Sequence, residues 1–206
     1  MPATHTDKYQ QQHHHAVCAA ASVFAEKGFH GASTKDIAER MGIKQGSLYY
    51  YFKSKEEALG EVCLFGIKDY VHRMEQIAAS DQPFEAKLLA VVTSHLTSYR
   101  EKNEALKVHN DERLYLPKEK RKTLKKLGSS YRQSLEGILE GGVRSGVLRS
   151  SLDCHFAAQS VIGLCNAWGD LIVRDPELDL FDIIQKCTDL LLNGMRERRR
   201  TDRTAD

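Results

Sequence analysis

Residues 33–55, with the sequence STKDIAERMGIKQGSLYYYFKSK, constrain the fold of this chain more than any other segment. Their first part predicts a short helix, because Thr34 stands where a helix needs a capping side chain at its N-terminus. Apolar residues then follow at helical spacing, at Ile37, Ala38 and Met41. The segment therefore begins with a capped helix that has one face for packing.

A second helix is expected after a sharp turn. Gly42 can take the left-handed conformation that ends a helix, and the second helix begins near Ser47 and Leu48. No acidic residue occurs in residues 43–55, so this helix offers only neutral and basic groups to a partner. Two short helices joined by a tight turn form a helix-turn-helix. The second helix is expected to contact the phosphates and base edges of DNA.

The longer segment 24–59, FAEKGFHGASTKDIAERMGIKQGSLYYYFKSKEEAL, resembles the N-terminal DNA-binding domain of the TetR family of bacterial transcriptional regulators. The resemblance implies a repressor that leaves its operator when a small molecule fills its C-terminal domain. The chain departs from a frequent family pattern at Gly46, so specificity is expected to rest on fewer side chains. The resemblance also implies the DNA contacts: Ser33, Thr34 and Lys55 on phosphates, and Lys44, Gln45, Ser47, Tyr49, Tyr50 and Tyr51 on the half-site.

The whole chain predicts an all-α fold. A three-helix helix-turn-helix domain is expected in residues 1–55, and a larger helical ligand-binding and dimerisation domain in residues 56–206. Residues 1–8 are predicted to be disordered, and the charged tail from Arg196 to be loose. Periodicity and breakers place helices at about 9–27, 54–79, 84–100, 118–145, 153–173 and 180–196, with a short helix between 103 and 117.

The composition suits a soluble helical protein, since 41% of the 206 residues are apolar and only four are proline. The N-terminus lacks the charged and apolar regions of a signal peptide, so the protein is expected in the cytoplasm with no membrane partner. Five cysteines without a C-x-x-C pair are interpreted as mostly buried, reduced thiols. His13, His14 and His15 would point about 100° apart on a helix, so no metal site is predicted.

An apolar effector cavity is expected among the C-terminal helices. Its polar groups and few acids suit an elongated apolar molecule with one anionic or hydrogen-bonding end, and Arg113 is the preferred partner for an anion. The basic residues in 118–126 form either a solvated face or a docking surface for the phosphates of an acyl-CoA. His95 also fits a satisfied core residue. The candidate ligand-binding residues are His95, Tyr99, His109, Asn110, Arg113, Tyr131, Asn166 and Trp168.

The last two helices are expected to pair with their copies in a two-fold dimer, which would bind a palindrome. No nucleophile elbow, P-loop, dinucleotide fingerprint or zinc-protease motif occurs, so neither an enzyme nor a cofactor is predicted. The alternatives are a regulator of drug efflux released by aromatic or cationic compounds, and an architectural DNA-binding protein without an effector. The dimer-interface candidates are Leu164, Trp168, Phe181 and Ile184.

Overall fold

The computed structural model describes residues 5–196 of the chain. The predicted disorder of residues 1–4 and the predicted looseness of residues 197–206 lie outside that range. Residues 5–8, which were also predicted to be disordered, are helical. The elements are α1 (His5–Gly31), α2 (Thr34–Arg40), α3 (Gln45–Leu48), α4 (Lys55–Ala79), α5 (Phe84–Glu101), α6 (Asn103–Glu112), the 3-10 turn η1 (Arg113–Tyr115), α7 (Lys118–Arg144), α8 (Cys154–Arg174) and α9 (Leu180–Met195).

The predicted all-α fold is confirmed. Within residues 5–196 the one β-type pairing is an isolated bridge between Leu148 and Arg196. The predicted glycine stops at Gly42 and Gly146 are confirmed, because both have a positive φ, near 70°, just after the ends of α2 and α7. Gly28 also has a positive φ, of 68°, but it forms a kink within α1, which continues to Gly31. The second helix of the helix-turn-helix is shorter than expected, because α3 ends at Leu48 and the three tyrosines that follow form a turn.

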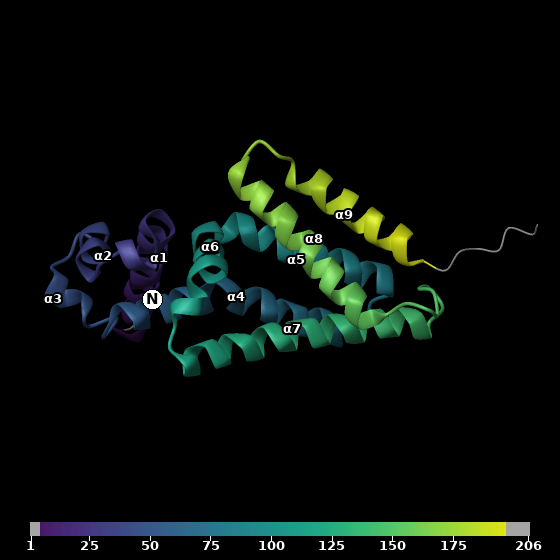
Figure 1. Ribbon diagram of the computed structural model, residues 1–206, viewed down its shortest axis with the longest axis horizontal. Coiled ribbons are helices and arrows are strands. Elements are labelled where there is room, and N and C mark those ends of the chain that lie inside the picture. Colours follow the sequence, from purple (N-terminus) through teal and green to yellow (C-terminus); the bar gives the residue numbers. More distant parts are fainter. Residues whose placement is uncertain (1–4, 197–206) are drawn as a thin grey trace, which may run out of the picture. The chain divides into compact units, whose positions relative to one another are not determined.

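The described chain divides into two compact units. The first unit contains the residues up to Asp69 together with Lys102–Leu127, and the second contains Tyr70–Glu101 together with the residues from Gly128 onward. Helices α4 and α7 therefore each contribute to both units. In the first unit α1 packs against α2 and α6, and α2 packs against α3 (Figure 1). The helix-turn-helix thus shares a unit with α6, which is distant from it in sequence.

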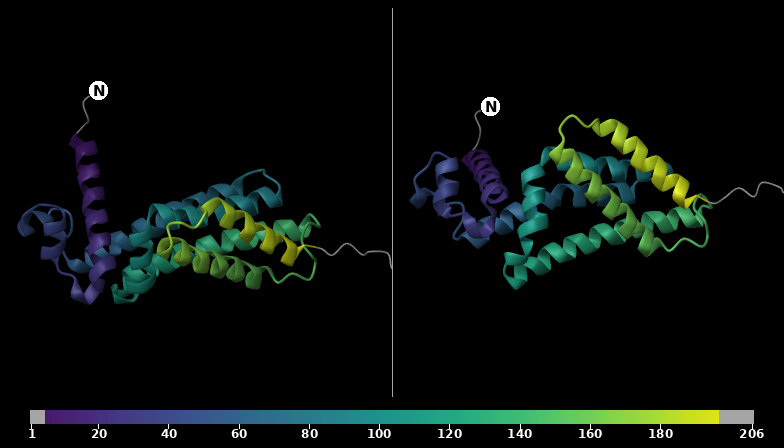
Figure 2. Two further views of the ribbon diagram at one scale, coloured as in Figure 1. Left: turned by 90° about the horizontal axis from the view of Figure 1, so that it is seen from above. Right: turned by 45° about the horizontal axis from the view of Figure 1, so that its top comes forward.

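In the second unit, α8 and α9 both pack against α5 and against each other, and α8 passes across α5 in Figure 1 (Figures 1 and 2). Helix α5 buries Leu88, Val92 and Leu96, which recur every four residues along one face. Aspartates cap the two other helices. Asp153 accepts from the Phe156 N–H at the start of α8, and Asp179 accepts from the Phe181 and Asp182 N–H groups at the start of α9. These caps and this apolar face fix where the helices of the unit begin and how they pack.

Helix α8 is long and apolar enough to cross a membrane by length and composition alone, with a mean hydropathy of 1.3. A core helix of a soluble protein can meet the same criterion. One face of α8 packs inside the second unit, where Ala158, Val161 and Cys165 are fully buried. On the other face Phe156 and Leu171 are exposed, so part of the apolar surface of α8 is not covered by the protomer.

Candidate nucleic-acid interface and ligand site

The start of α2 is held by its N-terminal cap. Ser33, and not Thr34 as predicted, is the capping residue: its hydroxyl accepts from the Asp36 N–H at 3.2 Å, and Asp36 accepts from the Ser33 N–H at 2.8 Å. This reciprocal pair is a capping box, which needs an acidic or amide side chain three residues after the cap. Thr34 has an apolar Ile37 at that position, so it cannot form one.

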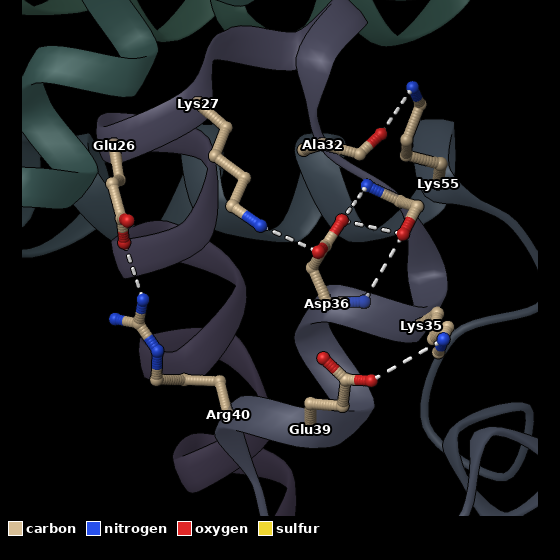
Figure 3. Close-up of polar contacts among 9 residues, drawn as sticks. Glu26, Lys27, Ala32, Lys35, Asp36, Glu39, Arg40 and Lys55 are labelled. Atoms are coloured by element: carbon tan, nitrogen blue, oxygen red, sulfur yellow. Dashed lines mark hydrogen bonds and ion pairs between the residues drawn. The ribbon is translucent and has the colours of Figure 1, made fainter.

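Two ion pairs fasten α2 to α1 (Figure 3). The Lys27 ammonium lies 2.6 Å from Asp36, and the Arg40 guanidinium lies 2.5 Å from Glu26. Hydrogen bonds from Lys27 and then from Ser33 hold the pKa of the Asp36 carboxyl well below its usual range. The position of α2 is therefore defined at both of its ends by contacts with neighbouring segments.

Helix α3 presents a polar surface to solvent. Leu48 is buried beneath it, and Gly42 provides the turn that leads into it. Tyr51 is half-buried, as is Thr34, while Ser33 is exposed. The other predicted DNA contacts around α3 are all exposed, namely Lys44, Gln45, Ser47, Tyr49 and Tyr50. The structure therefore brings the predicted half-site contacts together on one accessible segment, as contact with a DNA groove requires.

Tyr9 in α1 is a contributor to this surface that the sequence did not reveal. Its ring centroid lies 5.5 Å from that of Tyr50 in an edge-to-face arrangement, and 6.4 Å from that of Tyr51 in a stacked one. Aromatic pairs at these separations are attractive. Helix α1 thus supports the tyrosines that follow α3. The signal available in the sequence was a tyrosine at the exposed start of a helix, which does not specify a partner.

Lys55, predicted to bind a phosphate, has partners inside the first unit. Its ammonium donates to the Phe29 carbonyl at 2.7 Å and the Ala32 carbonyl at 2.9 Å, and it lies 4.4 Å from the centroid of the Phe29 ring. Figure 3 shows the bond to Ala32. An ammonium has three N–H donors. At most one of them is left for DNA, so Lys55 joins α4 to the end of α1 whether or not it also binds a phosphate.

Three of the predicted ligand-binding residues belong to the first unit. Arg113, the first residue of η1, donates to the carbonyls of His109 and Asn110 at 3.0 and 2.5 Å, which satisfies carbonyls at the end of α6. Burial, followed by the Arg113 charge, lowers the pKa of His109 to about 4, although a hydrogen bond with the Cys63 backbone opposes this. The Nδ1 atom of His109 is buried without a hydrogen-bond partner among the described residues. Asn110 is exposed.

Tyr99, Tyr131 and Asn166 gather around His95 in the second unit, and Trp168, also in this unit, is half-buried. The ring of His95 lies 2.9 Å from the Tyr131 hydroxyl through Nδ1 and 2.9 Å from Asn166 Oδ1 through Nε2. The Tyr99 hydroxyl donates to the same Asn166 oxygen at 3.1 Å. Since a carbonyl oxygen only accepts, His95 Nε2 carries the proton, and Nδ1 accepts from Tyr131. The four side chains therefore form one neutral network.

Burial controls the ionisation of this network. His95 is almost fully buried, and burial lowers its pKa to about 4, against the smaller effect of its bond to Asn166. Burial also raises the pKa of Tyr131 well above its ordinary value. Both groups are thus uncharged at neutral pH. The network is suited to hydrogen bonding with a neutral polar group and not to binding an ion through charge.

Arg73 is a second feature of this unit that the sequence prediction missed. Its guanidinium donates to the Ser94 hydroxyl at 2.8 Å and the Ser98 hydroxyl at 2.6 Å, and so connects α4 to α5. The only available signal was a cation between the apolar residues Val71 and Met74, whose partners on α5 could not be inferred.

The four predicted interface residues differ in exposure. Leu164 and Trp168 on α8 are half-buried, and Phe181 on α9 is 69% exposed. Ile184 is 6% exposed and lies in the protomer's own core. The exposed large apolar side chains of these two helices are Phe156 and Leu171 on α8, and Phe181 and Leu190 on α9.

Comparison with protein families gives two matches. Residues 17–62 match the description "Bacterial regulatory proteins, tetR family", and residues 81–195 match "Tetracyclin repressor-like, C-terminal domain". The chain is 34% identical to the HTH-type transcriptional repressor KstR2 of Rhodococcus jostii, over 67% of this chain and 68% of that protein. It is 27% identical to the fatty acid metabolism regulator protein of Bacillus subtilis, over 93% of this chain and 97% of that protein.

Solved structures with the same fold include two informative ones. The TetR family transcriptional regulator PfmR from Thermus thermophilus matches with a TM-score of 0.81 and 26% identity, over 88% of this chain and 99% of that one. The transcriptional regulator FadR from Bacillus subtilis, in complex with stearoyl-CoA, matches with a TM-score of 0.73 and 27% identity. That match covers 88% of this chain and 98% of the FadR chain.

Proposed function

This chain belongs to the TetR family of bacterial regulatory proteins, and we propose that it represses transcription from an operator that it leaves when an acyl-CoA binds. The single observation that supports DNA binding is the exposed polar surface of α3. Helix α3 packs against α2, which two ion pairs hold to α1. Lys44, Gln45 and Ser47 are the side chains that we assign to the half-site.

Two comparisons support the class of effector. FadR of Bacillus subtilis has been solved with stearoyl-CoA, and the fatty acid metabolism regulator of the same organism aligns with nearly the whole of this chain. The neutral network around His95 fits such a ligand, because a thioester carbonyl is a polar group without charge. In this proposal the Asn166 amide nitrogen donates a hydrogen bond to the thioester carbonyl oxygen, while the apolar chain packs against Leu88, Val92 and Leu96.

Arg113 is a weaker candidate for an effector anion than the sequence suggested. Its guanidinium donates to two carbonyls at the end of α6, and a ligand would have to replace them. The ligand's neutral carbonyl is therefore the group whose recognition we assign to the second unit.

We also propose that the protein acts as a two-fold homodimer in the cytoplasm, as a regulator and not as an enzyme. The large apolar side chains left exposed on α8 and α9 support an interface there, because a second copy of the chain would remove them from water. Phe156 and Phe181, at 71% and 69% exposure, are its main candidates, and Ile184 contributes from the protomer core beneath.

A ligand titration tests the effector class. Full-length protein is bound to a labelled duplex selected from a randomised pool, and stearoyl-CoA, stearate, free CoA or a cationic aromatic dye is then added while release is followed by fluorescence anisotropy. We expect stearoyl-CoA to release the protein at a lower concentration than stearate or CoA does. The variant Asn166→Leu should need about 10-fold more stearoyl-CoA, since a hydrogen bond to the ligand is lost. Gln133→Leu, on the exposed face of α7, serves as the control.

Release by the dye alone would instead support a regulator of drug efflux. The absence of release by all four compounds would favour an architectural DNA-binding protein. Equal responses of wild type and Asn166→Leu to stearoyl-CoA would show that the His95 network does not contact the effector.

A further inference from the structure

A hydrogen bond joins the first residue of α2 to the first residue of α3. The side-chain amide nitrogen of Gln45, Nε2, donates to the Thr34 hydroxyl oxygen at 3.0 Å. The hydroxyl of Thr34 is available for this bond because Ser33 caps α2 in its place. Two short helices whose backbones are connected through a turn are thus also connected at the surface that the DNA would meet.

The chemistry of the amide determines what this bond leaves free. A glutamine amide has one carbonyl oxygen and two N–H donors. With one N–H on Thr34, the Gln45 oxygen and the second N–H remain. Together they make the acceptor–donor pair that matches the N6 and N7 edge of adenine. Because the Thr34 oxygen accepts from Gln45, its own O–H points elsewhere and can still donate to a phosphate.

Thr34 provides the Gln45 amide with a hydrogen-bond acceptor whose position is well defined. It belongs to α2, which Asp36 and Arg40 hold to α1 through ion pairs. Gln45 by itself is an exposed, flexible side chain, and ordering such a side chain on binding lowers affinity by about 2- to 10-fold. The neighbouring residue is Gly46, which has no side chain to contribute, so the orientation of Gln45 matters more at this half-site.

We propose that Thr34 is a specificity-determining positioning residue, which orients the Gln45 amide for an adenine before DNA arrives. This inference rests on the assignment of Gln45 to a base under the proposed function. It differs from the phosphate contact predicted for Thr34, because it makes base preference, and not only affinity, depend on the threonine hydroxyl.

The test measures base preference with full-length protein. A duplex is selected from a pool with a randomised central region, and affinities are then measured for duplexes that differ from it at single base pairs. The variants are Gln45→Ala, Thr34→Val, Thr34→Ala, Thr34→Ser and the double variant Thr34→Val with Gln45→Ala. Thermal unfolding of each variant confirms that it is folded, and Thr34→Ala replaces Thr34→Val if valine destabilises α2.

We expect Gln45→Ala to reduce preference at one base pair by about 5- to 100-fold. Thr34→Val should reduce preference at the same base pair by about 2- to 10-fold, and Thr34→Ser should preserve it. In the Gln45→Ala background, Thr34→Val should leave every remaining preference unchanged, because residues that act through one another are not additive.

The outcomes separate the two levels of the proposal. If Gln45→Ala changes no base preference, the assignment of Gln45 to a base is wrong, and the inference about Thr34 falls with it. If Gln45→Ala relaxes a preference but Thr34→Val weakens all duplexes equally, only the inference is wrong, and Thr34 is a phosphate contact. A shift of preference at a different base pair in Thr34→Val would also overturn it.

Discussion

Lowering the pH from 7 to 5 should cost this protein about 2 kcal/mol of folding free energy through His95 alone. Burial lowers the pKa of His95 from 6.5 to about 4 in the folded state. The unfolded chain therefore binds a proton at this side chain more readily than the folded chain does, and acid favours unfolding. The stabilising effect is complete above pH 6.5 and is lost as the pH falls towards 4.

The substitution His95→Gln isolates this effect. Glutamine cannot titrate in this range, but it can still donate to Asn166 and accept from Tyr131. Urea unfolding at a fixed protein concentration, at pH 7 and pH 5, should show a loss of stability that is smaller in the variant by about 2 kcal/mol. His109, with a similarly lowered pKa, contributes a loss of the same sign to both proteins and cancels in the comparison.

Two controls sharpen the measurement. The exposed His15, changed to glutamine, shows what the substitution does at the surface of α1. An NMR titration reports the pKa of His95 directly. Equal losses of stability in wild type and His95→Gln, or a His95 titration centred near 6.5, would contradict the reasoning from burial.

Two further predictions concern the second unit. A methyl group added at Gly169 would overlap the Tyr99 ring, so Gly169→Ala should lower the free energy of unfolding by about 1–3 kcal/mol. Gly137 has open space around it, so Gly137→Ala should not lower it. Thermal unfolding compares the two variants, and equal melting temperatures would refute the prediction. Phe181→Glu should give monomers in sedimentation experiments together with weaker operator binding, because Phe181 is 69% exposed on the proposed interface; a stable dimer would place the interface elsewhere.

The sequence was sufficient to predict the helices and most of their ends. Glycines with positive φ and apolar spacing are local signals, and α4, α5 and α8 each begin or end within a residue or two of their predicted limits. The misplaced cap at Thr34 was avoidable, because the carboxylate three residues after Ser33 marks a capping box. One position along the chain decides which hydroxyl caps the helix and which stays free.

The partners of individual side chains were beyond the reach of the sequence. Periodicity indicates which face His95 occupies, but Asn166 lies 71 residues further along the chain, and no local pattern connects the two. Lys55 shows the same limit, because its basic character suggested a phosphate while its ammonium donates to the carbonyls of Phe29 and Ala32. Short-range patterns specify elements, and pairings between distant residues emerge only from packing.

The first unit is built from two segments that are separate in sequence, and this limits how the protein can be truncated or recombined. Lys107 donates to the carbonyl of Ala25, and Tyr115 stacks on Phe29. Residues from the middle of the chain therefore complete the packing of α1. A fragment ending after residue 55 would lose these supports and expose the side of α1 that α6 covers. A chimeric regulator that exchanges DNA specificity should therefore carry Lys102–Leu127 along with the residues up to Asp69, or exchange only the exposed side chains of α3. Recombination at a single crossover between these two segments would separate parts of the chain that pack together in one unit.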